Sequence, residues 1–328
     1  MTSRYRLFRR LALAGVVLAF GVVVLGAYVR LNAAGLGCPD WPGCYGHLTA
    51  GDAARNVDAA NEAFPHRPFE YHKAIKEMVH RYFASSLGFL ILVLAGLAIA
   101  NRKDPQQPLV LPIVLVGLVI LQGLLGMWTV TLLLKPLIVV AHLFGGLATL
   151  ALLASLGDWR HTRVSAPTPA LRALGLAAAA ALVLQIFLGG WTSSNYAAVA
   201  CPDFPTCQTQ WWPAIADFKD GFVLWRGLGI DYEGGVLDHP ARVAVHFTHR
   251  LGAVVAALLI AALGARLLAS RGTVPDGLAV LAVLALQLSL GISIVVFHVP
   301  LPVAVAHNGV AALLLLVVLN ANQRIRQS

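Results

Sequence analysis

The chain has 328 residues, of which 58% are hydrophobic and only 12% are charged, and its mean hydropathy is +0.75. Soluble domains carry about 25% charged residues, so the composition excludes an ordinary soluble enzyme and predicts a protein that crosses a membrane several times. The net charge of +9 does not indicate nucleic-acid binding, because the basic residues stand in short groups beside apolar runs, as topology signals do.

Eight apolar stretches are long enough to cross a bilayer, which takes about 20 helical residues. They are predicted as helices over residues 8–30, 76–100, 109–132, 136–157, 170–193, 242–268, 276–298 and 302–320. The first stretch could pass for a signal peptide, but it is too long and has no small-residue cleavage site before Arg30, so it is predicted to remain as the first helix. The expected fold class is an all-α polytopic membrane protein.

The basic residues predict the orientation of these helices. They gather on one side of the membrane, which the positive-inside rule makes the cytoplasmic side. These residues are Arg9, Arg10, Arg102, Lys103, Arg160, Arg163, Arg172, Arg266, Arg271, Arg324 and Arg326. Both termini should share that side. The opposite, outer side should carry two long loops, about 31–75 and 194–241, which hold most of the acidic residues.

The sequence repeats itself, four spans at a time. Residues 26–44 align without a gap with residues 189–207, and further matches follow along both halves. The halves are predicted as residues 1–157 and 170–328, joined by a polar, proline-bearing cytoplasmic linker over 158–169. Because each half begins on the same side of the membrane, the two should form pseudo-symmetric, parallel four-helix bundles.

Two histidines in each half occupy matching spans. His80 and His142 lie in the second and fourth spans of the first half, and His249 and His307 hold the same places in the second half. All four fall near the outer ends of their spans, so each half presents two imidazoles at one depth on different helices. This arrangement favours paired axial ligands of a haem iron in a four-helix bundle. The alternative is that the histidines only hydrogen-bond between helices.

The repeat is asymmetric beside these histidines. Glu77 lies three residues before His80, whereas His246 takes the corresponding place in the second half. A spacing of three puts either residue on the same helix face as the following histidine. A carboxylate at a membrane boundary needs a role or a partner, so Glu77 is either catalytic or paired with Lys73 or Arg81.

Three arginines lie where a haem carboxylate would reach the outer interface. Arg81 and Arg250 directly follow the histidines of the second span in each half, and Arg30 ends the first span. A guanidinium in such a place suits a contact to a haem propionate. The alternative for each is an anchor at the membrane interface.

Two cysteine pairs of the same spacing fall in the long outer loops. Cys38 and Cys44 lie in the first loop, and Cys201 and Cys207 lie in the second. Cysteines in an oxidising compartment favour disulfides, and the prolines inside each short loop bend the chain in advance. The spacing does not match a zinc site. A structural disulfide and a redox-active pair are both compatible with the pattern.

Together these motifs resemble haem A synthase. The resemblance rests on the Gly-x-x-Val-Arg-Leu run after the first span, the Cys-x5-Cys loops, the Glu77-x-x-His80-Arg81 run and the later ligand-type histidines, and it covers about residues 10–320. The cysteine pairs are similar to those of the bacterial branch. The resemblance implies an inner-membrane enzyme that oxidises a methyl group of haem O to the formyl group of haem A for terminal oxidases.

The resemblance also implies different roles for the two halves. His249 and His307 would ligate the iron of a resident haem b that relays electrons, while His80 and His142 would hold the iron of the substrate haem O. Glu77 would be the catalytic carboxylate at the substrate methyl group. The implied partners are haem O, membrane lipid, a haem O synthase and an unidentified electron donor. A homo-oligomer is compatible with the sequence, and nucleic acid is not expected.

The main alternative is a di-haem b protein that only passes electrons. A transmembrane relay needs haems at different depths, whereas all four histidines lie near the outer side, and it has no use for a carboxylate in one half only. A transporter with parallel repeats would need broken helices and a polar cluster at the membrane midplane, which the spans do not contain. The sequence therefore favours the enzyme.

Overall fold

The computed structural model describes residues 3–157, 168–270 and 272–326. Within these residues, eight helices are long and apolar enough to cross a membrane, which confirms the predicted fold class. They are α1 (Ser3–Leu31), α4 (Tyr71–Ala100), α5 (Val110–Thr131), α6 (Pro136–Leu156), α7 (Pro169–Ser194), α9 (His239–Leu268), α10 (Val274–Val296) and α11 (Leu301–Arg326). Three short helices lie in the long loops: α2 (Ala50–Ala53), α3 (Val57–Ala63) and α8 (Phe218–Gly221).

Several long helices begin before the apolar stretch that predicted them. Helix α4 starts at Tyr71 and α9 at His239, a few residues ahead of the predicted spans. At α9 the side chain of Asp238 accepts the backbone N–H of Ala241 at 3.0 Å and caps the helix. Pro240 follows in the first turn, where a missing N–H breaks no helical hydrogen bond. Hydropathy detects only the apolar part of a helix, so it does not predict a polar first turn.

The chain folds into two compact units. The first comprises Met1–Asp158 together with Arg226–Gly234, and the second comprises Trp159–Trp225 together with Gly235–Ser328. Of the predicted linker, only Thr168 and Pro169 fall within the described residues, and the Thr168 side chain caps the start of α7. The assignment of a separate role to each half stays a prediction.

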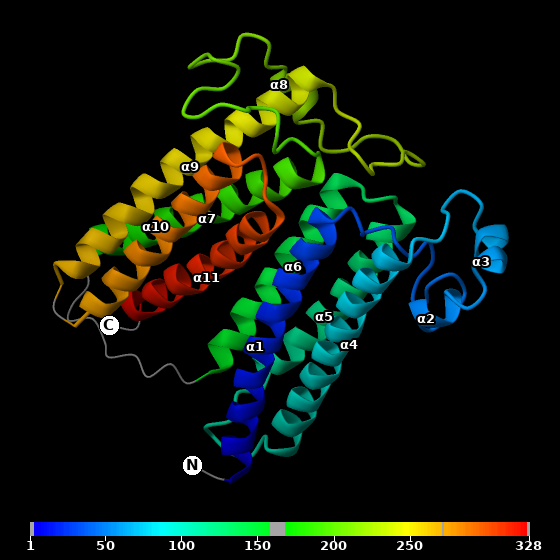
Figure 1. Cartoon of the computed structure of the whole chain (residues 1–328). Helices are drawn as coiled ribbons and strands as arrows, with labels where there is room; N and C mark the ends of the chain where they lie inside the picture. The colour runs from blue at the N-terminus through cyan, green and yellow to red at the C-terminus, as the bar shows by residue number, and fades with distance from the viewer. Residues whose placement is uncertain (1–2, 158–167, 271, 327–328) are drawn as a thin grey trace. The chain divides into compact units, whose positions relative to one another are not determined.

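Each unit contains a ring of four long helices. In the first unit α1 packs on α4 and α6, and α5 also packs on α4 and α6. Figure 1 shows these four helices running side by side. In the second unit α7 packs on α9 and α11, and α10 also packs on α9 and α11. Both rings therefore join their helices in chain order and close the last helix on the first.

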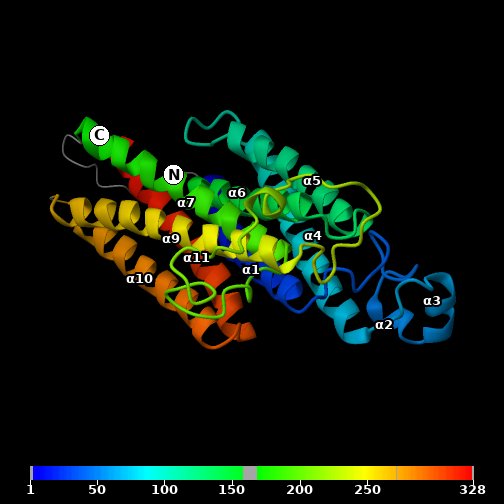
Figure 2. The ribbon, with the colours of Figure 1, turned by 90° about the horizontal axis from the view of Figure 1, so that it is seen from above.

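The first bundle is apolar inside and outside. On α4 the side chains of Leu87, Ile91 and Leu94 are buried, while Phe89 on the same helix is 70% exposed. Large exposed apolar side chains along a helix suit a surface that faces lipid. Figures 1 and 2 show α2 and α3 beside the end of the bundle where α4 begins, away from the N-terminus of α1. That end carries the candidate site.

Candidate functional site

In the first unit, each candidate ligand packs against a glycine of the preceding long helix. His80 lies on α4 and His142 on α6, both half-buried. A Cβ added to Gly26 on α1 would lie 3.0 Å from Cε1 of His80, and one added to Gly126 on α5 would lie 3.6 Å from Cε1 of His142. The missing side chains let each ring approach the neighbouring backbone closely.

The second unit repeats this packing. A Cβ added to Gly189 on α7 would lie 3.2 Å from Cε1 of His249 on α9. One added to Gly291 on α10 would lie 3.1 Å from Cε1 of His307 on α11. The two imidazoles of each unit are close enough to interact electrostatically. The structure thus brings together the two pairs that the sequence singles out, each pair on opposite members of a helix ring.

Three of these imidazoles have an unsatisfied ring nitrogen. Nδ1 of His80, His142 and His307 is buried and has no hydrogen-bond partner among the described residues. Buried polar atoms in native structures are nearly always paired, so these three rings lack the partner that a purely helix-bridging histidine would have at Nδ1. Imidazoles on different helices of one bundle are the donor set that a haem iron takes. The residues therefore fit the predicted haem in each unit.

Glu77 forms an ion pair and also anchors the first cysteine loop. It is only 5% exposed. One carboxylate oxygen accepts the backbone N–H of Cys38 at 2.9 Å, and the other accepts Nη2 of Arg81 at 2.5 Å. Lys73 pairs with Glu70 instead, at 2.8 Å. The ion pair considered from the sequence is therefore present with Arg81, one turn along the same helix.

His246 takes the same place in the second unit. It is also 5% exposed. Its Nδ1 accepts the backbone N–H of Cys201 at 3.2 Å, and its Nε2 lies 3.3 Å from Nε of Arg250. The two units therefore share one framework, in which the side chain three residues before the histidine holds the loop cysteine and contacts the arginine. The framework accepts a carboxylate in one unit and an imidazole in the other.

The guanidinium groups of Arg81 and Arg250 donate to backbone carbonyl oxygens of the cysteine loops. Nη1 of Arg81 donates to the carbonyl oxygens of Asp40 at 3.1 Å and Gly43 at 2.5 Å. Nη1 of Arg250 donates to the carbonyl oxygen of Asp203 at 2.7 Å. The contact of either arginine with a haem propionate stays a prediction. Arg30 lies in the last turn of α1, and its contact with a haem propionate also stays a prediction.

Both predicted disulfides are formed. Cys38 is bonded to Cys44 and Cys201 to Cys207, and the described residues include no free cysteine. Each disulfide closes its loop next to the anchoring side chain, because the first cysteine of each pair donates its N–H to Glu77 or His246. The loops are thus fixed at three points: the disulfide, the anchor and the arginine.

The first unit includes a segment from the second long loop, residues 226–234, which we call the strap. Lys135, in the turn between α5 and α6, is 2% exposed and donates from Nζ to the carbonyl oxygen of Arg226 at 2.5 Å. Burial lowers the pKa of this lysine. Tyr232 of the strap is also 2% exposed and packs in a cluster with Leu36 and Val130. The strap therefore forms part of the core of the first unit.

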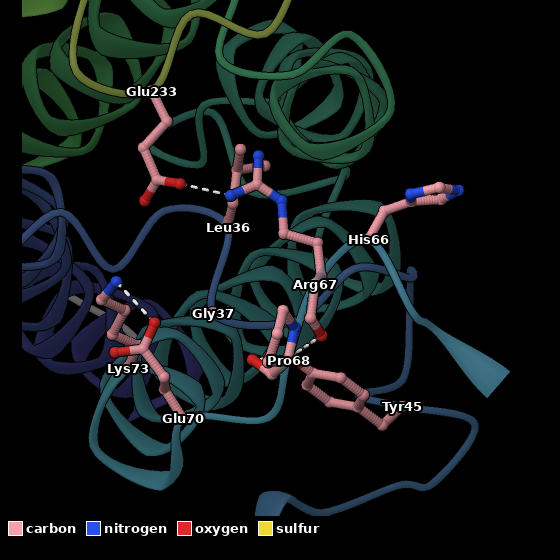
Figure 3. Close-up of a pocket in the computed structure, with 9 residues that line it drawn as sticks. All are labelled: Leu36, Gly37, Tyr45, His66, Arg67, Pro68, Glu70, Lys73 and Glu233. Atoms are coloured by element: carbon pink, nitrogen blue, oxygen red, sulfur yellow. Dashed lines mark hydrogen bonds and ion pairs between the residues drawn. The ribbon is translucent and has the colours of Figure 1, made fainter. Parts of the chain in front are cut away.

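Arg67 joins the strap to the first long loop. Its guanidinium forms ion pairs with Asp231 and Glu233. Figure 3 shows it reaching towards Glu233. Both residues line a cavity of about 80 Å³, as does Gly37. The Tyr45 hydroxyl donates to the carbonyl oxygen of Arg67 at 3.0 Å. Burial raises the pKa of Tyr45 to about 12, so this donor stays protonated at neutral pH.

Sequence reasoning missed the strap. The contacts of Arg67 with Asp231 and Glu233 join residues far apart in the chain, and no periodicity links them. A signal was present in Lys135, a cation in a short apolar turn on the predicted outer side. A cation placed there needs a partner, and the strap carbonyls supply it.

Truncating Tyr232 should strongly destabilise the protein. Tyr232→Ala removes a buried aromatic ring, which typically costs about 3–5 kcal/mol of unfolding free energy. Tyr232→Phe should be neutral or stabilising, because the hydroxyl is buried without a partner among the described residues. Tyr71→Ala is the matched control, since this tyrosine is 50% exposed. Denaturant unfolding in detergent measures all three, and equal losses in Tyr232→Phe and Tyr232→Ala would contradict the packing of the ring.

Comparison with known proteins gives one consistent result. The family model described as COX15-CtaA, cytochrome oxidase assembly protein, matches residues 9–319. A Heme A synthase of Shewanella oneidensis is 45% identical over 307 residues, which cover 92% of this chain and 91% of the relative. Heme A synthases of Rhizorhabdus wittichii and Caulobacter vibrioides are each 29% identical, over 91% and 94% of this chain and 88% and 93% of their own lengths. The similarity covers both units.

Proposed function

This chain belongs to the COX15-CtaA family of cytochrome oxidase assembly proteins, and from that membership we propose that it is an inner-membrane oxidoreductase that converts haem O into haem A. Relatives similar over nearly the whole chain carry the name Heme A synthase. The eight apolar helices among the described residues suit an enzyme whose substrate is a membrane-dissolved porphyrin.

The two units divide the work in this proposal. In the second unit, His249 and His307 would hold the iron of a resident haem b. That haem supplies single-electron transfer when bound. In the first unit, His80 and His142 hold the iron of haem O, so that the substrate lies at the same depth as Glu77 on α4. The two imidazole pairs hold corresponding positions in the repeat.

The observation that carries the proposal is the exchange of Glu77 for His246 within one framework. Both side chains accept the N–H of a loop cysteine and contact the arginine one turn later. Since an imidazole anchors the second loop, anchoring does not require a carboxylate. A carboxylate in the first unit alone therefore supports a chemical role there rather than a purely structural one.

Glu77 is suited to move a proton during methyl oxidation. Converting a methyl group to a formyl group removes protons as well as electrons, so the site needs a base. Glu77 lies almost wholly inside the protein, and Arg81 at 2.5 Å orients its carboxylate. The same carboxylate can stabilise positive charge that develops on the substrate. The arginine and the closed loop hold this group at one end of α4 and shield it from water.

The test of the proposed function is the haem content of the purified protein. It is expressed with and without a source of haem O, and its haems are extracted and separated by chromatography. Haem b alone without the source, and haem b with haem O or haem A when the source is present, are expected for the enzyme. Two equivalents of haem b under both conditions would instead identify a di-haem electron carrier and reduce Glu77 to a structural ion pair.

Adding one methyl group at Gly189 should weaken haem b binding. The new Cβ would lie 3.2 Å from Cε1 of His249, so the ring would have to shift from its position. We expect the ratio of haem b to protein to fall several-fold, with the melting temperature unchanged. Gly117→Ala is the control, because an added Cβ there meets nothing within 4 Å. Full haem b content in Gly189→Ala would argue against His249 as a ligand.

A further inference from the structure

Gln185 on α7 makes a double contact with His249 on α9. Its amide Nε2 lies 3.0 Å from Nδ1 of the imidazole and 3.0 Å from the backbone carbonyl oxygen of the same residue. The amide oxygen Oε1 is buried and has no partner among the described residues. Gly252, three residues along α9, provides the space for this amide, because an added Cβ would lie 2.5 Å from Oε1.

This contact singles out one of the four candidate ligands. Nδ1 of His80, His142 and His307 is buried and unpaired within the described part of the chain. Gln287 does approach His307, but it contacts Nε2 at 3.2 Å, on the opposite side of the ring from Nδ1. Only His249 therefore has its Nδ1 held by another side chain among the described residues.

The first unit does not contain the residues that make this contact. In the alignment of the repeat, Gln185 corresponds to Val22 on α1, and Gly252 corresponds to Phe83 on α4. Valine has no group that could hydrogen-bond an imidazole, and the first unit has a phenylalanine where the second unit has Gly252. The two units thus differ in how firmly a candidate ligand is held, as well as in the side chain that anchors the loop.

We propose that Gln185 is a positioning residue that makes the second unit retain its haem while the first unit exchanges one. The inference rests on the proposed function, in which haem b is resident and haem O is the substrate. A ligating imidazole is oriented by the partner of its other ring nitrogen, and loss of that partner typically weakens metal binding by about 10–100-fold. With Nε2 of His249 on the iron, Nδ1 would carry the proton, and the Gln185 amide would turn so that its oxygen, which has no other partner among the described residues, accepts that proton.

The unpaired imidazoles of the first unit suit the release of a haem rather than its retention. A product haem has to leave after each reaction, whereas an electron-transfer haem has to remain through many. An imidazole with no partner at Nδ1 has no hydrogen bond that fixes its orientation, so binding it to the iron costs more conformational entropy. His80 and His142 therefore bind iron less firmly than His249 does. The ligand is an imidazole in both units, and the difference is the missing contact at Nδ1.

The test compares rates of haem b loss. Gln185→Met keeps the length of the side chain and removes its hydrogen bonds. Transfer of haem b from the purified protein to excess apomyoglobin should become about 10–100-fold faster. Gln122→Met, on α5, is the matched control, since Nε2 of Gln122 has no partner among the described residues, and it should lose haem b at the wild-type rate. An unchanged rate in Gln185→Met would overturn the proposal.

Two further variants extend the test to properties that a merely structural role would not change. Gln185→Glu keeps an acceptor for Nδ1–H, so it should retain haem b and lower its reduction potential. The double change Val22→Gln with Phe83→Gly transfers the contact to the first unit and should slow the release of haem O. Release at the wild-type rate would count against the proposal.

His249→Ala separates this inference from the proposed function. If His249→Ala still holds haem b with a wild-type spectrum, the second unit is not the haem b site, and both the proposed function and the role of Gln185 are wrong. If His249→Ala loses haem b while Gln185→Met releases it at the wild-type rate, only the role of Gln185 is wrong.

Discussion

Replacing Glu77 with histidine should abolish haem A formation while leaving haem b in place. Glu77→His gives the first unit the anchor that the second unit already uses, where His246 accepts the N–H of a loop cysteine and contacts Arg250. The loop should therefore stay closed. The proton-transferring carboxylate is lost, and general acid–base groups typically contribute about 10²–10⁴-fold in rate. Chromatography of extracted haems then shows haem O in place of haem A.

Glu77→Gln provides the isosteric comparison. The amide oxygen still accepts the N–H of Cys38, but the side chain carries no charge and takes up no proton at neutral pH. We expect the same block, with haem b measured in parallel by its absorption spectrum. Wild-type haem A output from either variant would disprove the catalytic assignment. Loss of haem b along with haem A would show that Glu77 acts on the fold of the whole protein.

Removing either imidazole of the second unit should leave the protein without haem b. His249→Ala and His307→Ala each delete one of the two imidazoles that would hold the haem iron. Metal sites typically lose about 10–100-fold in affinity when only a group that supports a ligand is removed. Removing a ligand itself should therefore lower the haem b content to less than about a tenth of the wild-type value. Haem A should disappear as well, because electrons no longer reach the first unit.

His72→Ala is the control for these two substitutions. This histidine lies in the first turn of α4 and is exposed, so it should keep the full haem b content. The pyridine haemochrome assay gives the ratio of haem b to protein in all three variants. Wild-type haem b in His249→Ala or His307→Ala would move the resident haem out of the second unit.

The fold could be predicted where it follows from local patterns. Apolar run length identifies the eight spans, and the spacing of Cys38 with Cys44 and of Cys201 with Cys207 identifies the disulfides, because both features depend on near neighbours in the chain. Helix starts were less accurate, since a polar first turn such as that before Ala241 is fixed by a cap rather than by hydropathy.

The candidate site was predictable only in part. The internal repeat exposes the difference between Glu77 and His246 because the two can be compared position by position. It does not show that both side chains hold a cysteine N–H, since that contact joins a helix to a distant loop. The strap and Gln185 depend on contacts between helices and loops with no common period. Such contacts follow from the packing of the bundle and need the three-dimensional structure.

In the proposed function, the first unit binds the substrate and the second unit does not. The most direct measurement is the haem inventory of the double variant His80→Ala with His142→Ala, expressed with a source of haem O. We expect haem b at the wild-type level, with neither haem O nor haem A in the purified protein. Haem A in this variant, or the loss of its haem b, would contradict the division of labour between the two units.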